Sequence, residues 1–302
     1  MKAIGGYFEL DEGNGNTPLP NGVLLNSARN ALRHIVRQLK IKRIHIPRYI
    51  CPVVEDALRA ESCAIEHYDL NDAFLPAKDF SKRDTVLYVN YFGVSGKRVE
   101  FLAKQYPNLI VDCAQAYYAL PKGRASFSSP RKFFGIPDGG VAYGFENATY
   151  MCDDSSMRMG HLIERKTHGA TPEGYALFQT AEHSLEGAPI CEMSDETKRM
   201  LSHVDMMNAA TIRKYNFTYL HEHLHSSFPF AMAEDDVPMV YPLLTENASL
   251  RQRLIDNKIF VARYWPDVEE QNNFADKIIP LPIDQRYNLE DMNRICEVIK
   301  NV

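Results

Sequence analysis

Residues 85–115 read TVLYVNYFGVSGKRVEFLAKQYPNLIVDCAQ, and this stretch decides the fold. It opens on the clearest strand pattern of the chain, TVLYVNYF, and continues with a helical pattern from Gly96 to Tyr106. The apolar run NLIVD, residues 108–112, then predicts a second, buried strand. Strands that alternate with helices indicate a parallel sheet covered by helices on both faces, so we expect an α/β fold.

The same alternation extends towards the N-terminus. After an opening that we expect to be irregular, Asn26 and Ser27 are capping residues placed before an apolar series at helical spacing. The segments RIHIP (43–47) and CAIEHYDL (63–70) read as strands, and CPVVEDALRA (51–60) between them reads as a helix with proline in its first turn.

Towards the C-terminus, the sequence predicts two domains. Residues 126–140 are too rich in Gly, Pro and Ser for a regular element and predict a loop, which leads into a strand, GGVAYGF (139–145). Residues 155–224 look mostly helical, with one long helix from near Ser194, and residues 228–237 read as a linker. We therefore expect a large domain over residues 1–227 and a small α/β domain over residues 228–302. The small domain should hold strands near Met239, Phe260 and Ile278, and helices near Leu250 and from Leu289.

Composition excludes several classes of protein. The 302 residues carry 34 Lys and Arg against 39 Asp and Glu, a formal charge of −5, without a basic run, which disfavours a nucleic-acid or anionic-membrane surface. No stretch reaches the ~18 apolar residues of a membrane span, and the first residues lack the apolar core of a signal peptide, so we expect a cytoplasmic protein. The six cysteines contain no C-x-x-C pair and read as buried, reduced thiols.

One group of residues points to cofactor chemistry. Asp112 and Gln115 lie at the end of a predicted strand, and Lys132 follows in the Ser- and Gly-rich loop. In folds of this class, functional groups gather beyond the carboxyl ends of the strands. A lysine that forms a Schiff base with pyridoxal phosphate needs a carboxylate partner for the pyridine nitrogen, because a protonated ring accepts electrons. It also needs donors for the phosphate, which serine hydroxyls and the start of a helix provide.

These segments resemble a known family. VDCAQAYYA (111–119) and SPRKFFGIPDGG (129–140) resemble the aspartate, alanine-glutamine and lysine signatures of the DegT/DnrJ/StrS family of nucleotide-sugar aminotransferases, which are fold type I pyridoxal phosphate enzymes. The resemblance covers nearly the whole chain, since four further segments are similar: LNSARNAL (25–32), IHIPRYICP (44–52), EMSDETKRML (192–201) and LPIDQRYNLEDMNRI (281–295). It implies a large domain with a mostly parallel central sheet and a small C-terminal α/β domain.

The resemblance also implies roles for single residues. Lys132 would form the Schiff base with the cofactor, and Asp112 would contact the pyridinium nitrogen, so both would be catalytic. Gln115 would approach the ring hydroxyl, and Tyr49, in the segment that resembles the family's proline-tyrosine loop, is a further cofactor-binding candidate.

The phosphate contacts are less defined. Ser27 and the amides that follow it, at Ala28 and Arg29, would hold the phosphate, and a serine before the lysine, either Ser126 or Ser128, would add to them. Ser27 could equally serve as a plain helix cap, or serve as both. Arg29 stands where the family has a neutral donor, and it either replaces that donor or points away.

Other positions depart from the family's pattern. The acidic glycine-rich stretch after the lysine is shortened to Pro137, Asp138, Gly139 and Gly140. Ile190 replaces the asparagine that a neighbouring subunit often contributes, and Glu192 replaces the usual arginine nearby. These replacements leave open whether activity is retained.

A second motif would imply other chemistry. His221, Glu222 and His225 match H-E-x-x-H, which on a helix would present two zinc ligands and a general base. No third ligand follows at a characteristic spacing, and histidines are favoured at the end of a helix by its dipole, so we expect no metal here.

The sequence therefore predicts a pyridoxal phosphate-dependent aminotransferase that transfers an amino group to a keto nucleotide-sugar in surface polysaccharide or sugar biosynthesis. Its small-molecule partners would be a nucleotide-sugar and an amino donor, and the resemblance implies a homodimer. The alternative is a non-catalytic relative that retains the fold for a regulatory or structural role.

Overall fold

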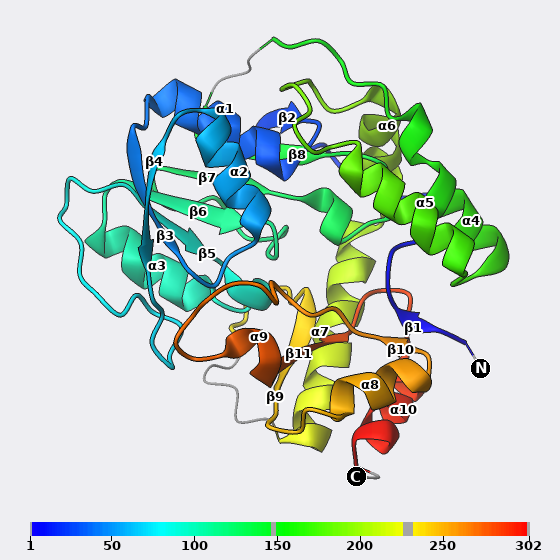
Figure 1. Cartoon of the computed structure of the whole chain (residues 1–302). Coiled ribbons are helices and arrows are strands. Elements are labelled where there is room, and N and C mark those ends of the chain that lie inside the picture. The colour runs from blue at the N-terminus through cyan, green and yellow to red at the C-terminus, as the bar shows by residue number, and fades with distance from the viewer. Residues whose placement is uncertain (1, 146–148, 226–231, 301–302) are drawn as a thin grey trace.

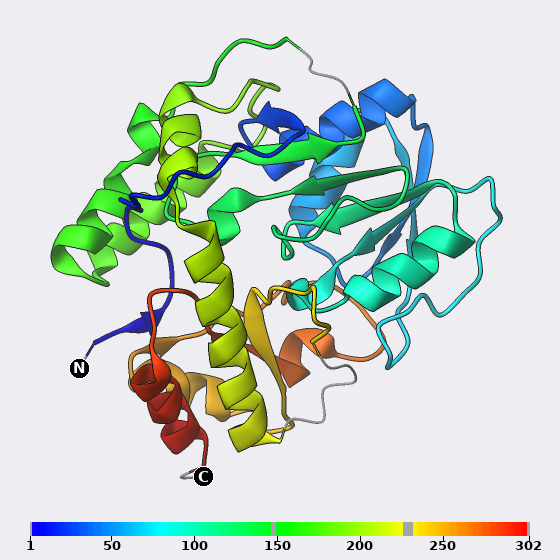
Figure 2. The same ribbon diagram turned by 180° about the vertical axis from the view of Figure 1, so that it is seen from behind.

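The computed structural model describes residues 2–145, 149–225 and 232–300. Figures 1 and 2 show a large twisted sheet with helices on its faces and, below it, a smaller group of strands and helices that contains both ends of the chain. The α/β class predicted from the sequence is confirmed.

The central sheet has seven strands, in the order β2-β8-β7-β6-β5-β3-β4. They are β2 (Val23–Leu25), β3 (Arg43–Pro47), β4 (Ala64–Tyr68), β5 (Val86–Val89), β6 (Leu109–Cys113), β7 (Ala125–Ser128) and β8 (Gly140–Tyr143). Only β8 runs antiparallel to its neighbours, β2 and β7. The prediction of a mostly parallel sheet is therefore confirmed.

Helices cover both faces of this sheet, as the chain connections require. The first three are α1 (Ala28–Leu39), α2 (Pro52–Ala60) and α3 (Gly96–Gln105). The crossovers β3-α2-β4 and β5-α3-β6 run in opposite directions across the sheet, so right-handed connections place α2 and α3 on opposite faces. Helix α1 packs beside α2, and Figure 2 shows α3 on the face that is turned away in Figure 1.

Helix α1 forms for the reasons visible in the sequence. The Ser27 hydroxyl accepts a hydrogen bond from the Asn30 amide at 3.2 Å, which caps the first turn. The apolar residues Ala31, Leu32, Ile35 and Val36 are buried on one face. The helix ends at Lys40, which adopts a left-handed conformation with φ 53°.

Three predictions about local structure were wrong. Residues 126–140 were expected to form a loop, but Ala125–Ser128 is a fully buried strand, β7, because pairing with β6 and β8 satisfies its backbone despite its poor strand composition. The short 3₁₀ turn η2 (Pro130–Lys132) follows it. The opening was expected to be irregular throughout, but it contains β2 and a two-residue strand, β1 (Ile4–Gly5).

The long helix expected from near Ser194 is two helices, α6 (Asp195–His203) and α7 (Met206–Leu224). Val204 is extended, with φ −65° and ψ 132°, and the Asp205 carboxylate accepts a hydrogen bond from the Asn208 amide at 3.0 Å. Asp205 therefore caps a new helix, which a continuous helical pattern does not reveal.

The remaining elements lie beside and below the sheet. They are the 3₁₀ turns η1 (Tyr91–Gly93) and η3 (Ser156–Arg158), helices α4 (Gly160–His168) and α5 (Pro172–His183), and the C-terminal β9 (Val240–Leu244), α8 (Leu250–Asp256), β10 (Ile259–Phe260), α9 (Phe274–Lys277), β11 (Ile278–Pro282) and α10 (Leu289–Lys300). The C-terminal strands and helices occur where the sequence predicted them, except for α9, which the sequence did not predict. The expected domain boundary at 227/228 lies outside the described residues, so the two-domain division stays a prediction.

Two segments outside the central sheet, β1 and α7, contact the C-terminal elements. Strand β1 pairs with β10, and α7 packs against α10 and β9. None of the helices in the described ranges is long and apolar enough to cross a membrane.

Residues Gly6 to Asp11 follow β1 and form an irregular segment, here called the N-terminal strap. The Asp11 amide donates to the Gly135 carbonyl at 3.0 Å, and the Leu10 amide donates to Leu162 at 3.0 Å. A Cβ atom on Gly135 would lie 1.6 Å from the Glu9 carbonyl oxygen. Only glycine therefore lets the strap lie directly on the loop that contains Lys132.

We predict that Gly135→Ala lowers the free energy of unfolding by about 2 kcal/mol or more, because a backbone clash cannot be relieved by a rotamer change. Thermal unfolding should shift down by several degrees. Gly160→Ala is the matched control, since its Cβ would meet only the Leu177 side chain at 3.7 Å. Equal melting temperatures for the two variants would contradict this account of the strap.

Candidate active site

The candidate site lies at the edge of the sheet where the parallel strands end. Strands β5, β6 and β7 are parallel and finish side by side, and β6 carries Asp112 at this edge. The turn after β7 carries Lys132. The carboxyl edge of the sheet thus brings these two residues together, as the sequence predicted for this fold class.

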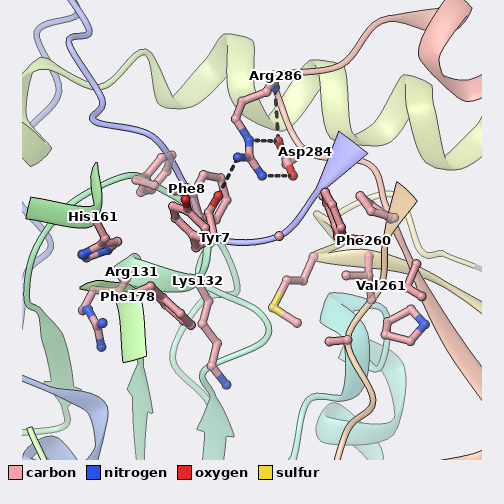
Figure 3. Close-up of a pocket in the computed structure, with 18 of the residues that line it drawn as sticks. Tyr7, Phe8, Arg131, Lys132, His161, Phe178, Phe260, Val261, Asp284 and Arg286 are labelled. Atoms are coloured by element: carbon pink, nitrogen blue, oxygen red, sulfur yellow. Dashed lines mark hydrogen bonds and ion pairs between the residues drawn. The ribbon is translucent and has the colours of Figure 1, made fainter. Parts of the chain in front are cut away.

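Lys132 faces a cavity of about 590 Å³. One wall is aromatic, from Tyr7 and Phe8 of the N-terminal strap and Phe178 of α5. Figure 3 shows Arg131 and Lys132 extending from their turn to the same side, away from the paired Asp284 and Arg286. The Lys132 side chain is exposed to this space. The cavity is large enough for a small organic ligand.

Asp112 is 5% exposed and does not itself line the cavity. One of its carboxylate oxygens accepts a hydrogen bond from the Ala114 amide at 2.8 Å. Burial raises the pKa of Asp112 above its ordinary value, against the opposing effects of the Lys132 charge and this hydrogen bond. The carboxylate therefore lacks a full partner for its charge, and a cationic N–H group placed against it would stabilise it.

Gln115 has a structural partner. Its side-chain oxygen accepts a hydrogen bond from the Phe92 amide at 2.7 Å, and Phe92 is left-handed with φ 58°. Gln115 is 1% exposed and thus holds the strained turn η1 in place beside Asp112. Contact between the Gln115 side chain and a ligand stays a prediction.

The start of α1 lies against the loop that follows Lys132. A Cβ on Gly140 would lie 2.2 Å from the Ser27 carbonyl carbon and 2.4 Å from the Ala28 nitrogen. An isolated parallel β-bridge joins the backbones of Ser27 and Gly139, and Gly139 has φ +125°. These two glycines are required for the close approach that brings the positive end of α1 to the lysine loop.

The two candidate serines before Lys132 differ in their surroundings. The Ser128 hydroxyl lies 3.4 Å from the Tyr143 hydroxyl. The Ser126 hydroxyl is enclosed and has no hydrogen-bond partner among the described residues. A buried hydroxyl without a partner carries a free-energy cost, which favours Ser126 over Ser128 as the serine that serves a ligand.

Arg29 points towards the site and meets a residue that sequence reasoning missed. Its Nη2 lies 3.6 Å from a carboxylate oxygen of Glu182, in α5, and Arg131 donates to the other oxygen. Burial acts to raise the pKa of Glu182, but the charges of Arg131, Arg29 and Lys132 lower it overall. No sequence signal marks Glu182, because it is one of several polar residues in an exposed helix.

Tyr49 is placed elsewhere. It is 2% exposed and packs against Tyr91 and Trp265, with ring centroids 5.9 and 4.7 Å away. Burial raises its pKa well above the ordinary value. Tyr49 is not among the residues that line the cavity, and its position supports packing rather than ligand contact.

Three further residues lie around the lysine turn and its cavity. Arg213 of α7 is fully buried and donates to the Phe133 carbonyl at 3.2 Å, and Gln285 donates to the same oxygen at 2.8 Å. His161 of α4 lines the cavity, and burial, together with the nearby charge of Arg131, lowers its pKa to about 4. His161 is therefore neutral at pH 7 and can act there as a hydrogen-bonding group without adding charge.

The residues that depart from the family's pattern make structural contacts within this chain. The Asp138 carboxylate accepts hydrogen bonds from the Ser194 amide and hydroxyl, at 2.9 and 3.0 Å, and from Thr197, so it joins the lysine loop to the start of α6. Ile190 is buried in the core. Glu192 lies 3.6 Å from Lys198 and accepts from the Tyr150 amide at 3.4 Å.

The H-E-x-x-H residues do not form a cluster of ligands. His221 lies 3.4 Å from the Tyr241 hydroxyl, and His225 is the left-handed residue that ends α7. Across the part of the chain that the structure describes, no three His, Cys, Asp or Glu side chains are grouped so as to hold a metal ion. That this motif binds no metal remains a prediction.

The donors at the strand edge fit pyridoxal phosphate. Asp112 would offer a buried carboxylate to a ring nitrogen, Lys132 would offer an exposed amine, and the unpartnered Ser126 hydroxyl and the start of α1 would offer donors to a phosphate.

Comparisons with known proteins bear on the fold. No family model matches the chain, and no curated protein matches it. Solved structures do: Spr1654 from Streptococcus pneumoniae, a candidate sugar aminotransferase in its PMP form, superposes with a TM-score of 0.67 at 16% identity, covering 95% of this chain and 88% of that one. The same protein has also been solved in a PLP form, with a TM-score of 0.65.

Two other solved structures are similar. A DegT DnrJ EryC1 StrS aminotransferase from Brucella abortus has a TM-score of 0.62 at 12% identity, covering 94% of this chain and 86% of that one. S. venezuelae DesV, in complex with a ketimine intermediate, has a TM-score of 0.61 at 17% identity, covering 93% and 84%. At these identities the comparison establishes the fold, and the fold type I architecture expected from the sequence is confirmed.

The buried charge of Asp112 gives a testable dependence on pH. The pKa of Asp112 is higher in the folded protein than the ordinary 3.8. As the pH rises, the unfolded chain therefore releases this proton first. Over the pH range between the two pKa values, the folded state loses stability relative to the unfolded chain. We expect cofactor-free Asp112→Asn to melt at a higher temperature than the wild type at pH 7, with the difference shrinking as the pH approaches 3.8. The control is Asp267→Asn, at an exposed position, which should show no such difference. A lower melting temperature for Asp112→Asn than for the wild type at pH 7 would contradict this account, because it would show that the charge of the Asp112 carboxylate is already compensated in the folded protein.

Proposed function

We propose that the protein is a pyridoxal phosphate-dependent aminotransferase that transfers an amino group to a keto nucleotide-sugar, in surface polysaccharide or sugar biosynthesis. The observation that carries this proposal is that Lys132, exposed to a cavity, lies near Asp112, a buried carboxylate whose pKa is raised by burial against the opposing charge of Lys132. The solved structures that share the fold support it, since their names describe sugar aminotransferases.

The residues of this chain divide the work of such a reaction. When bound, pyridoxal phosphate supplies an electron sink that stabilises the carbanion formed in transamination. Asp112 would hold a proton on the ring nitrogen, because a buried carboxylate favours a cation beside it. Lys132 would hold the cofactor through its Nζ atom and, once released from it, carry a proton to and from the reacting carbon.

The cavity walls suit this chemistry. Tyr7, Phe8 and Phe178 form an apolar surface beside Lys132, and a surface of this kind excludes water from the reacting atoms. His161 is neutral at pH 7, so it can orient a sugar hydroxyl without competing with Lys132 for protons. The choice of sugar, nucleotide and amino donor would be made by residues across the cavity from Lys132.

We also propose that the enzyme works in the cytoplasm as a homodimer. Large apolar side chains are exposed on η3, α4 and α5, which lie next to one another: Met157 (89%), Ile163 (49%), Tyr175 (52%) and Leu177 (44%). Exposed apolar side chains on neighbouring elements favour association with another protein surface. A two-fold contact would use the same patch twice.

Covalent labelling of Lys132 tests the proposed chemistry. Incubation with pyridoxal phosphate should produce a visible absorbance band, borohydride should fix the cofactor, and peptide mapping should find it on Lys132. Lys132→Ala should remove the label, and Asp112→Ala should keep it while slowing the half-reaction with an amino donor by orders of magnitude, since about 1.4 kcal/mol corresponds to a factor of ten. A label on another lysine would contradict the assignment, and the absence of any label would favour the non-catalytic alternative.

Light scattering tests the dimer. At micromolar concentration we expect the mass of two chains, and Met157→Glu with Leu177→Glu should shift it to that of one, because charges would be placed in an apolar contact. Leu120→Glu is the control, since Leu120 is 78% exposed outside this patch. A wild-type protein that is monomeric under these conditions would contradict the proposal.

A further inference from the structure

Three parts of the chain meet beside Lys132 in an arrangement of two arginines and one carboxylate. Arg29 comes from the first turn of α1, Arg131 from η2, and Glu182 from the last turn of α5. Arg29 Nη2 lies 3.6 Å from one carboxylate oxygen of Glu182, and Arg131 Nη2 donates to the other. Glu182 therefore bridges the guanidinium groups of two arginines that are 102 positions apart in the sequence.

The charges in this group do not balance. Arg29, Arg131 and the adjacent Lys132 supply three positive charges, and the three together lower the pKa of Glu182, which supplies one negative charge. The group lies at the start of α1, whose dipole adds a partial positive charge. A second negative charge at this place would be stabilised.

The two guanidinium groups also have hydrogen-bonding capacity to spare. Arg29 Nη1 and Arg131 Nε are enclosed, and neither has an acceptor among the described residues. An enclosed N–H without an acceptor costs free energy, and a guanidinium fork matches the oxygen spacing of a phosphate. The arginines are therefore only partly satisfied by the single carboxylate they share.

We propose that Arg29 and Arg131 form a binding subsite for a phosphate dianion, and that Glu182 occupies this subsite as an internal counterion that competes with the phosphate. A dianion matches the charge of the two arginines, whereas the carboxylate of Glu182 neutralises only half of it. Glu182 lines the cavity and its side chain is 31% exposed, so its carboxylate has open space to turn towards. Arg131 and Lys132 are consecutive residues of η2 and both line the cavity, so a phosphate held by Arg131 would share that cavity with the amine.

The inference rests on the proposed function only for the identity of the phosphorylated ligand, which is either the cofactor or the nucleotide-linked substrate. The subsite itself requires no reaction at Lys132. Binding of inorganic phosphate to the cofactor-free protein therefore tests the subsite separately from the chemistry.

The first measurement is calorimetric titration of the cofactor-free protein with inorganic phosphate. Glu182→Gln should bind phosphate about tenfold more tightly than the wild type, because the competing charge is removed while the side chain keeps its size. Arg29→Gln and Arg131→Gln should each weaken binding about tenfold. Glu186→Gln is the matched control, since it removes the same charge from an exposed position four residues further along.

The second measurement identifies the source of the phosphate. Affinity for pyridoxal phosphate is compared with affinity for pyridoxal, which lacks the phosphate, and affinity for uridine diphosphate is measured on cofactor-loaded protein. If Glu182→Gln tightens only pyridoxal phosphate, the subsite serves the cofactor, and if it tightens only the diphosphate, the subsite serves the substrate.

The two proposals fail in different ways. Tighter binding of phosphate by Glu182→Gln, with no covalent label on Lys132, would retain the subsite and reject the aminotransferase. Labelling of Lys132, with Glu182→Gln binding phosphate no more tightly than Glu186→Gln, would retain the aminotransferase and overturn the competition between Glu182 and phosphate. Weaker binding by Glu182→Gln would overturn it as well, because it would show that Glu182 orients the arginines for the ligand.

Discussion

The backbone carbonyl of Phe133 fixes the position of the lysine on which the candidate site depends. It accepts hydrogen bonds from Arg213 Nη2 at 3.2 Å and from Gln285 Nε2 at 2.8 Å. Arg213 also donates to Met239 at 3.0 Å, and its guanidinium lies 4.6 Å from the centre of the Phe133 ring. Burial lowers the pKa of Arg213 to about 10, so it remains charged at pH 7. A buried charge of this kind is stable only when its donors are satisfied, which makes the conformation of the turn and the placement of α7 depend on each other.

The lysine loop is held on its other sides by backbone contacts that leave no room for side chains. The N-terminal strap lies on Gly135, and the start of α1 lies on Gly140. Between them, Asp138 accepts three hydrogen bonds from the start of α6. The loop therefore has the irregular sequence of a connection and the rigidity of a core element. Rigid support of this sort is what a reactive amine requires, because small displacements of a reacting group reduce the rate strongly.

The sequence predicted those parts of the site that depend on one segment at a time. The buried run that ends at Asp112 marks a strand and its carboxyl end, and the residues around Lys132 carry a recognisable pattern. The strand β7 was missed because its pairing with two neighbours, and not its composition, makes it a strand. Asp205 was missed as a cap because apolar residues continue on both sides of it.

Contacts between distant segments could not be predicted. Glu182 joins the site only because the end of α5 comes close to the start of α1 and to η2, and nothing in its own segment indicates that approach. Arg213 is similar, since a single arginine in a helix is ordinarily exposed. For Tyr49 the reverse holds: the segment resembles a family loop, but Trp265 and Phe274 from the C-terminal elements pack on its ring, with centroids 4.7 and 5.4 Å away.

The two carboxylates near Lys132 illustrate how position divides their roles. Asp112 is buried and Glu182 is partly buried, and in both burial acts to raise the pKa. Asp112 has one backbone hydrogen bond and the Lys132 charge against that effect, so its pKa stays raised, whereas the paired arginines reverse the effect at Glu182. Asp112 therefore gains most from a cationic N–H brought to it, and Glu182 is already compensated and loses its partners if an anion takes its place. Consider a ligand with a protonated ring nitrogen at one end and a phosphate at the other. Its ring nitrogen would compensate the charge of Asp112, and its phosphate would displace Glu182 from the arginines. Binding of such a ligand would therefore couple the two ends of the site through charge.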